Sequence, residues 1–271
     1  MIGVVLCAAP IALPLYLYEA AATQGQSIIW APVCLVIVLV AVLPLWLRQI
    51  HRVRHPWRAL GCTGGITWLK HWGYAFALGG MSVIGLYVIQ LLMGWGQWVG
   101  LDADRWLQFL FEGALLGLGV GLAEELLFRG WILFELEQDY PSHVTVGLNA
   151  CLFAIAHYLR PISSILATWP QFLGLVLLGV TLVWARRIPI KIASQNSSSK
   201  HLGFAAGLHG GLVWAYYQFN VGDLVKTTGQ VPAWVTGIDN NPLAGLLGIG
   251  LLLGLASFTY QLSHRQVDWR I

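Results

Sequence analysis

The sequence predicts an all-α polytopic membrane protein, a bundle of about eight transmembrane helices around a polar intramembrane cavity. Hydrophobic residues make up 57% of the 271 positions and charged residues only 10%, whereas soluble domains carry roughly a quarter of charged residues. The apolar residues also gather in runs of about 20, which is the length that crosses ~30 Å of hydrocarbon.

Eight apolar runs mark the expected helices in chain order. They cover residues 2–18, 27–47, 74–98, 106–134, 144–159, 165–185, 202–220 and 243–262. The first run could instead be a signal peptide, because Ala20 to Ala22 resembles a cleavage site, but no Lys or Arg precedes it. The fifth run is short for a span, and the fourth continues into Glu135, Glu137 and Asp139, so that helix should emerge from the membrane at one face.

The basic residues predict the orientation, because Lys and Arg accumulate in short cytoplasmic loops. Twelve of the fifteen fall on one side of the predicted topology: Arg48, Arg52, Arg54, Arg58, Lys70, Arg129, Arg186, Arg187, Lys191, Lys200, Arg265 and Arg270. The opposite loops hold Arg105, Arg160 and Lys226. An integral, multi-pass protein with both termini in the cytoplasm follows. Basic residues scattered over short loops do not form a nucleic-acid surface, and the four cysteines follow no metal-ligand spacing.

Two adjacent glutamates and an arginine interrupt the fourth apolar run. A charged side chain at bilayer depth costs at least about 2.5–3.5 kcal/mol, so a cluster of such residues indicates a functional site. Glu125 and Arg129 are four residues apart and should meet on one helix face, whereas Glu124 points about 100° away. We therefore expect Glu125 to be structural and Glu124 to be available for chemistry.

Further polar residues lie in later runs. Asn149, Phe153 and His157 repeat every four residues and share a helix face, and His209 lies in the seventh run. Each alone is as compatible with a hydrogen bond between helices as with a functional group. Together with Glu124, the two histidines could bind zinc or could hold a water molecule without metal, and the HExxH pattern is absent. The remaining polar residues are expected in loops or without a local partner: His51, His55, His71, His143 and Glu112.

Three motifs occur in order, each on its own apolar helix: Glu124-Glu125-x-x-x-Arg129, Phe153-x-x-x-His157 and Gly207-Leu208-His209. They resemble the motifs of the CPBP (Abi, CAAX-protease and bacteriocin-processing) family of intramembrane endopeptidases, over roughly residues 106–220.

The resemblance implies a glutamic-type peptide hydrolase that needs no metal or other cofactor, with zinc not favoured. Glu124 and His157 would activate water, Glu125 and Arg129 would support the site, and His209 would stabilise the oxyanion. The partners would be the lipid bilayer and a membrane-associated peptide or protein. Residues 1–105 would then form three helices with a basic loop, residues 106–220 the catalytic core, and residues 221–271 an outer loop, the last helix and a tail.

One residue departs from the family pattern. Members commonly carry Asn or Asp four residues after the last histidine, where this chain has Val213. Loss of one oxyanion donor typically lowers the rate by ~10²–10³, although Asn149 could line the same cavity and substitute for it. A catalytically weak relative that binds or protects another membrane protein is thus the main alternative, and a transporter is a third, which the absence of visible repeats disfavours.

Overall fold

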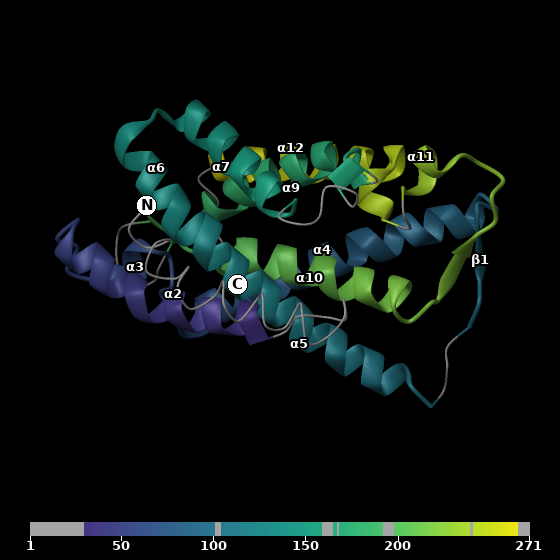
Figure 1. Ribbon diagram of the computed structural model, residues 1–271, viewed down its shortest axis with the longest axis horizontal. Coiled ribbons are helices and arrows are strands. Elements are labelled where there is room, and N and C mark those ends of the chain that lie inside the picture. The colour runs from purple at the N-terminus through teal and green to yellow at the C-terminus, as the bar shows by residue number, and fades with distance from the viewer. Residues whose placement is uncertain are drawn as a thin grey trace.

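The computed structural model describes residues 30–100, 104–158, 165, 166, 168–191, 198–238 and 241–264, and most of these residues are helical, as predicted (Figure 1). The main helices are α2 (Trp30–Gln49), α4 (Gly65–Leu92), α5 (Trp106–Glu125), α7 (Ser142–Ala156), α9 (Gln171–Arg186), α10 (Gly203–Asn220) and α12 (Leu246–His264). Shorter pieces are α3 (Pro56–Ala59), the π-helical segment η1 (Leu126–Ile132), α6 (Leu133–Asp139), α11 (Ala233–Thr236) and the 3₁₀ turn η2 (Pro242–Ala244).

Three helices in the described part of the chain are long and apolar enough to cross a membrane. They are Gly65–Leu92, the 34-residue helix Trp106–Asp139 and Leu246–His264, and shorter apolar helices cover Val36–Gln49, Ser142–Ala156 and Gln171–Arg186. This count is below the eight predicted spans, and the first predicted span, residues 2–18, lies outside the described residues. Large apolar side chains point outward, among them Leu92, Leu107 and Phe111. An apolar exterior is what a lipid environment requires, so the fold is that of a membrane protein.

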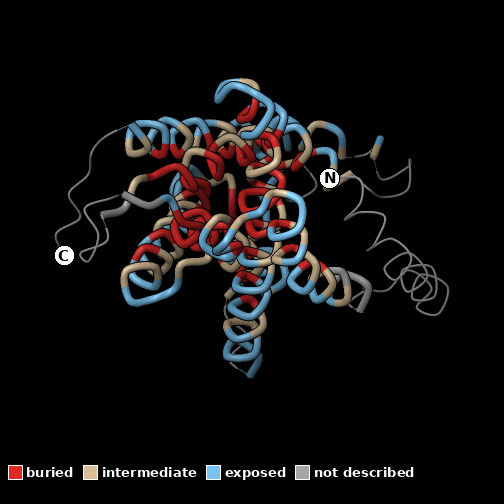
Figure 2. The backbone as a smooth tube through the Cα atoms, turned by 90° about the vertical axis from the view of Figure 1, so that its left-hand side faces the viewer, coloured by how far each residue is buried: buried red, intermediate tan, exposed pale blue. Residues whose placement is uncertain are grey.

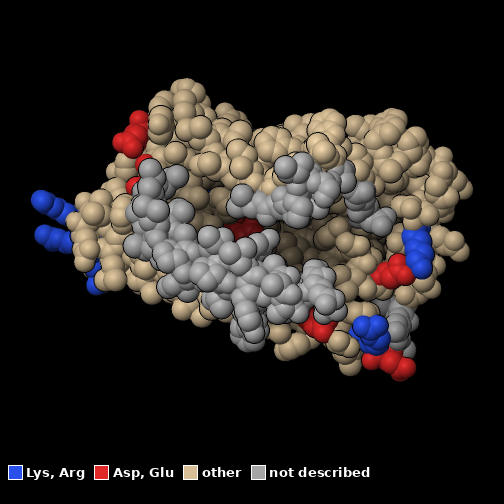
Figure 3. Space-filling view, viewed as in Figure 1, with Lys and Arg blue, Asp and Glu red and all other residues tan. Residues whose placement is uncertain are grey.

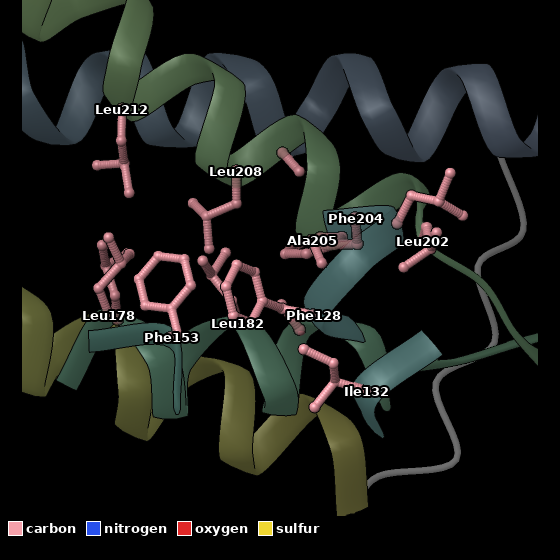
Figure 4. Packing of buried hydrophobic residues seen from close by; sticks show 14 of the residues in the cluster. Phe128, Ile132, Phe153, Leu178, Leu182, Leu202, Phe204, Ala205, Leu208 and Leu212 are labelled. Carbon is pink, nitrogen blue, oxygen red and sulfur yellow. The ribbon is translucent and has the colours of Figure 1, made fainter. Parts of the chain in front are cut away.

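The main helices form two layers, and α10 lies at the centre of the fold in one of them (Figure 1). In one layer α10 packs between α4 and α5, and in the other α9 packs against α7 and α12. Figure 2 shows the buried residues concentrated between the layers. Figure 4 shows how Leu208 and Leu212 of α10 face Phe153, Leu178 and Leu182 across that boundary. The core therefore lies between the residues that carry the second and third sequence motifs.

Glycines allow α10 to approach its neighbours closely. A Cβ atom at Gly207 would overlap the carbonyl oxygen of Trp72, and one at Gly211 would overlap the carbonyl oxygen of Phe76. On the other side, a Cβ at Gly121 of α5 would lie 2.6 Å from the carbonyl oxygen of Ala206. Small residues let helix backbones meet in this way in membranes, where packing has to replace the hydrophobic effect. As a result, α10 is held along its length between α4 and α5.

The boundaries of the third predicted helix are wrong. α4 begins at Gly65 instead of residue 74 and ends at Leu92 instead of residue 98. His71, expected in a loop, is buried in α4, where its Nδ1–H donates to the carbonyl oxygen of Thr67 at 2.7 Å. The helix stops because Gly94 has a φ of 73°, a conformation that glycine adopts without strain.

Two short antiparallel pairs of strands complete the described fold. β1 (Gly96–Trp98) pairs with β4 (Val225–Thr227), which ties the end of α4 to the segment after α10. β2 (Pro189–Lys191) pairs with β3 (Ser198–Lys200) and leads the chain from α9 into α10.

Candidate active site

The first motif lies where the long helix changes from α to π geometry. Glu124 and Glu125 end α5, and Arg129 lies in η1, the π-helical segment. π-helical turns are rare and occur frequently at functional sites, because they widen the helix and redirect side chains. Asn149 of α7 supports this segment, since its Nδ2 donates to the carbonyl oxygen of Phe128 at 2.8 Å.

The second glutamate of the pair belongs to a buried network. Arg129 Nη1 donates to Glu125 Oε1 at 3.0 Å, as the spacing of four residues predicted, and both side chains are fully buried. Arg129 Nη2 donates to the carbonyl oxygen of Gly179 at 3.1 Å. His209 Nδ1 lies 3.0 Å from the same Glu125 oxygen. Glu125 therefore joins α5, η1 and α10 in one network.

The first glutamate faces His157, the histidine of the second motif. Glu124 Oε2 lies 3.7 Å from His157 Nε2, and the two side chains are 31% and 27% exposed. This distance is too long for a direct hydrogen bond between the two groups. It is short enough for both of them to contact one small molecule, such as water, at the same time. His157 Nδ1 lies 2.8 Å from the carbonyl oxygen of Phe153 and must donate to it, because a carbonyl oxygen only accepts. In the neutral ring, Nε2 then presents a lone pair towards Glu124.

Phe153 lies between the two groups of residues. Its ring centroid is 4.5 Å from that of His157, 5.9 Å from that of His209 and 4.3 Å from Arg129 Cζ. The buried phenyl ring thus holds both imidazoles and the guanidinium in place. The three motifs, distant in the sequence, meet around it, and Figure 3 shows an acidic side chain at the floor of a recess on this face of the molecule.

Several of these contacts differ from those that the sequence predicts. The motifs predict His209 beside Glu124 and His157, whereas the hydrogen bond of His209 goes to Glu125. Asn149 was a candidate oxyanion donor, yet its amide nitrogen donates to Phe128, and its buried Oδ1 has no partner among the described residues. Glu112 was expected to lack a local partner, but Gln108 Nε2 and Tyr217 Oη donate to it. Val213 is half-buried in α10, one turn after His209.

Among the described residues, no group of three or more His, Cys, Asp or Glu side chains is placed to hold a metal ion. The groups that do converge can carry out acid and base chemistry. Glu124 and His157 together can accept and return a proton. The imidazole of His209 turns Nδ1 towards Glu125 and leaves Nε2 for another partner, and Nε2 carries a hydrogen when the ring is protonated.

Comparison with known proteins identifies the same region. Residues 106–194 match a family model described as Rce1-like, type II CAAX prenyl endopeptidase. The match contains the first two motifs and ends before His209. No curated protein and no solved structure was found to match the chain. The description of the matched model is that of a peptide hydrolase, which agrees over residues 106–194 with the family resemblance and the enzyme class that the motifs predicted.

Proposed function

We propose that this chain, which over residues 106–194 belongs to the CAAX protease family, is an intramembrane endopeptidase of glutamic type. The proposal rests above all on the 3.7 Å approach of Glu124 Oε2 to His157 Nε2, both partly exposed, beside a buried network that fixes Glu125. The catalytic core in this proposal extends over residues 106–220, since it needs His209 of α10.

In the proposed reaction, Glu124 takes a proton from a water molecule that His157 helps to hold, and the oxygen attacks the peptide carbonyl carbon. His209 Nε2–H donates to the resulting oxyanion, while Glu125 stabilises the protonated ring through Nδ1–H. When the carbon–nitrogen bond breaks, the proton on Glu124 passes to the leaving amine. Arg129 keeps Glu125 oriented, and no metal ion takes part in these steps.

The substrate in this proposal is a membrane-associated peptide or protein that reaches the site from the cytoplasmic leaflet. The positive residues support this orientation, with both termini in the cytoplasm. Among them, Arg48, Arg52, Arg54 and Arg58 follow or end α2, and Figure 3 shows Lys and Arg side chains projecting from that end of the molecule. Arg160, Arg265 and Arg270 lie outside the described residues.

The test is turnover of quenched peptides, prenylated and plain, by the purified protein in detergent. Glu124→Gln and His157→Gln should each lower kcat by about 10²–10⁴-fold, and the double variant should lose no more than either single one, because both groups act on the same water. Glu112→Gln is the matched control on the same helix and should keep full activity. If the fold-losses in kcat of Glu124→Gln and His157→Gln multiplied in the double variant, the shared role of the two groups would be contradicted.

The metal-free mechanism is tested separately by adding a chelator to the same assay. Turnover should stay unchanged. If the chelator abolished turnover and only zinc restored it, the zinc mechanism would have to replace the glutamic mechanism. If the native protein cleaves no peptide under any condition, the binding-protein alternative, which Val213 favours, would take its place.

A further inference from the structure

A small cavity lined by positive side chains lies behind the buried Glu125 network, on the side of η1 and α6. Its volume is about 40 Å³, and its charged lining comes from η1, α6, the end of α9 and β3: Arg129, Glu137, Arg186, Arg187 and Lys200. Three of these residues also line the volume of about 400 Å³ beside it: Glu137, Arg187 and Lys200. A narrow pocket therefore adjoins a wide vestibule.

The positive charge in this cavity is not balanced by the described residues. Arg129 is paired with Glu125, and Arg187 Nη2 donates to Glu137 at 2.8 Å. Arg186 and Lys200 make no ion pair or hydrogen bond with any described side chain. Glu137, the acidic residue in this lining, also acts on Arg186 but already forms an ion pair with Arg187, so positive charge exceeds negative charge among the lining residues.

Arg186 is the informative member because it is only 8% exposed. Its Nε is buried without a hydrogen-bond partner among the described residues. The guanidinium lies flat against Gly61, where a Cβ atom would approach Nη2 to 2.8 Å and Cζ to 2.9 Å. Gly61 has a φ of 86°, so glycine is favoured there for its backbone as well. A buried charge is costly unless paired, and this one is held in place with Glu137 nearby but without an ion pair of its own among the described residues.

We infer that this cavity is a binding site for the phosphate group of an anionic phospholipid. Guanidinium groups bind phosphate oxygens in a planar, two-pronged way, and Lys200 at the exposed mouth adds a point charge. A volume of about 40 Å³ has room for a group the size of a few water molecules, which suits one phosphate.

The vestibule fits the rest of a lipid better than a free ion. Trp184 and Tyr140 line it, and such residues concentrate where membrane meets water. It lies at the ends of α6, α9 and α12, which is the cytoplasmic side in the proposed orientation, and basic pockets between helices on that side bind anionic head groups. Arg129 lines the same cavity, so the head group would lie directly behind the residue that holds Glu125.

The experiment measures lipid retention by the full chain in an uncharged detergent, by native mass spectrometry and by the shift of the unfolding temperature. Phosphatidylglycerol should be retained and should stabilise the protein, whereas phosphatidylcholine should do neither. Lys200→Gln should weaken the retention of phosphatidylglycerol about five-fold and Arg186→Gln about ten-fold or more. Arg48→Gln is the control, since Arg48 is exposed on the same proposed side, at the end of α2, and outside the cavity.

Each outcome of this experiment supports or overturns the proposed phospholipid site. Lys200 is exposed, so Lys200→Gln should fold even if Arg186→Gln does not. Stabilisation by inorganic phosphate to the same extent as by phosphatidylglycerol, lost in Lys200→Gln, would assign the site to free phosphate instead of lipid. Equal retention of both lipids, or equal losses in Lys200→Gln and Arg48→Gln, would overturn the inference.

Discussion

Replacement of Arg129 by methionine removes the cation between Glu125, the carbonyl oxygen of Gly179 and the ring of Phe153. Methionine is long and apolar, so it keeps much of the packing against Phe153 while the charge is lost. The carboxylate of Glu125 then remains fully buried, with His209 as its remaining hydrogen-bond donor.

The expected loss of stability follows from these contacts. Breaking a buried ion pair by removing one partner costs about 3–5 kcal/mol, because the other charge is left uncompensated. The lost hydrogen bond to Gly179 adds about 1 kcal/mol, and the lost interaction with the ring of Phe153 up to about 2 kcal/mol. The hydrogen bond from His209 still stabilises the carboxylate of Glu125, which offsets these smaller terms. We therefore expect a decrease of about 3–5 kcal/mol in the free energy of unfolding.

The assay is reversible unfolding in mixed micelles, with Arg105→Met as the control. Arg105 is exposed, and its Cζ lies 4.8 Å from the centroid of the Phe109 ring. Its replacement should lower the free energy of unfolding by no more than about 1 kcal/mol. The double variant Glu125→Gln/Arg129→Met removes both charges and should be more stable than Arg129→Met alone. A loss below about 1 kcal/mol in Arg129→Met, or strictly additive losses in the double variant, would refute the reasoning.

Three further predictions concern α10 and His201, which lies two residues before the start of this helix. Val213→Asn should raise kcat by adding a donor one turn from His209, and kinetics with the best peptide will measure this; an unchanged rate would mean that the oxyanion needs no donor at this position. Burial lowers the pKa of His201 to about 3 from an ordinary 6.5, so the unfolded chain binds more protons between these values. Stability should therefore be full above about pH 6.5 and decrease by up to about 1.4 kcal/mol per unit below it, whereas a His201→Gln variant should show a flatter profile in unfolding experiments. Gly207→Val should prevent α10 from packing on Trp72 and should lower the unfolding temperature and the folded yield; a stable variant would show that the close approach is not required.

The local part of the site could be predicted from the sequence, because helix geometry determines it. A spacing of four residues brings Glu125 to Arg129, and the 100° step turns Glu124 to a different, partly exposed face. The same periodicity correctly grouped Phe153 with His157. The catalytic roles of these residues stay predictions.

Contacts between distant segments could not be predicted in the same way. No periodicity in the sequence predicts the π-helical segment η1. The hydrogen bond from His209 to Glu125 could not be predicted either, because it depends on how α10 packs against α5. The sequence predicts too late a start for α4, because Lys70 and His71 are typical of a loop. In the structure Lys70 is exposed and His71 bonds within its own helix, so neither interrupts it.

The close packing of α10 also limits how the protein can move. Sliding or rotating this helix would drive the carbonyl oxygens of Trp72 and Phe76 into its backbone, so α10, α4 and α5 have to behave as one rigid unit. His209 is then a fixed point, and admission of a substrate has to come from displacement of other segments. Distances between spin labels on α4 and α10 should accordingly stay constant when a peptide inhibitor binds.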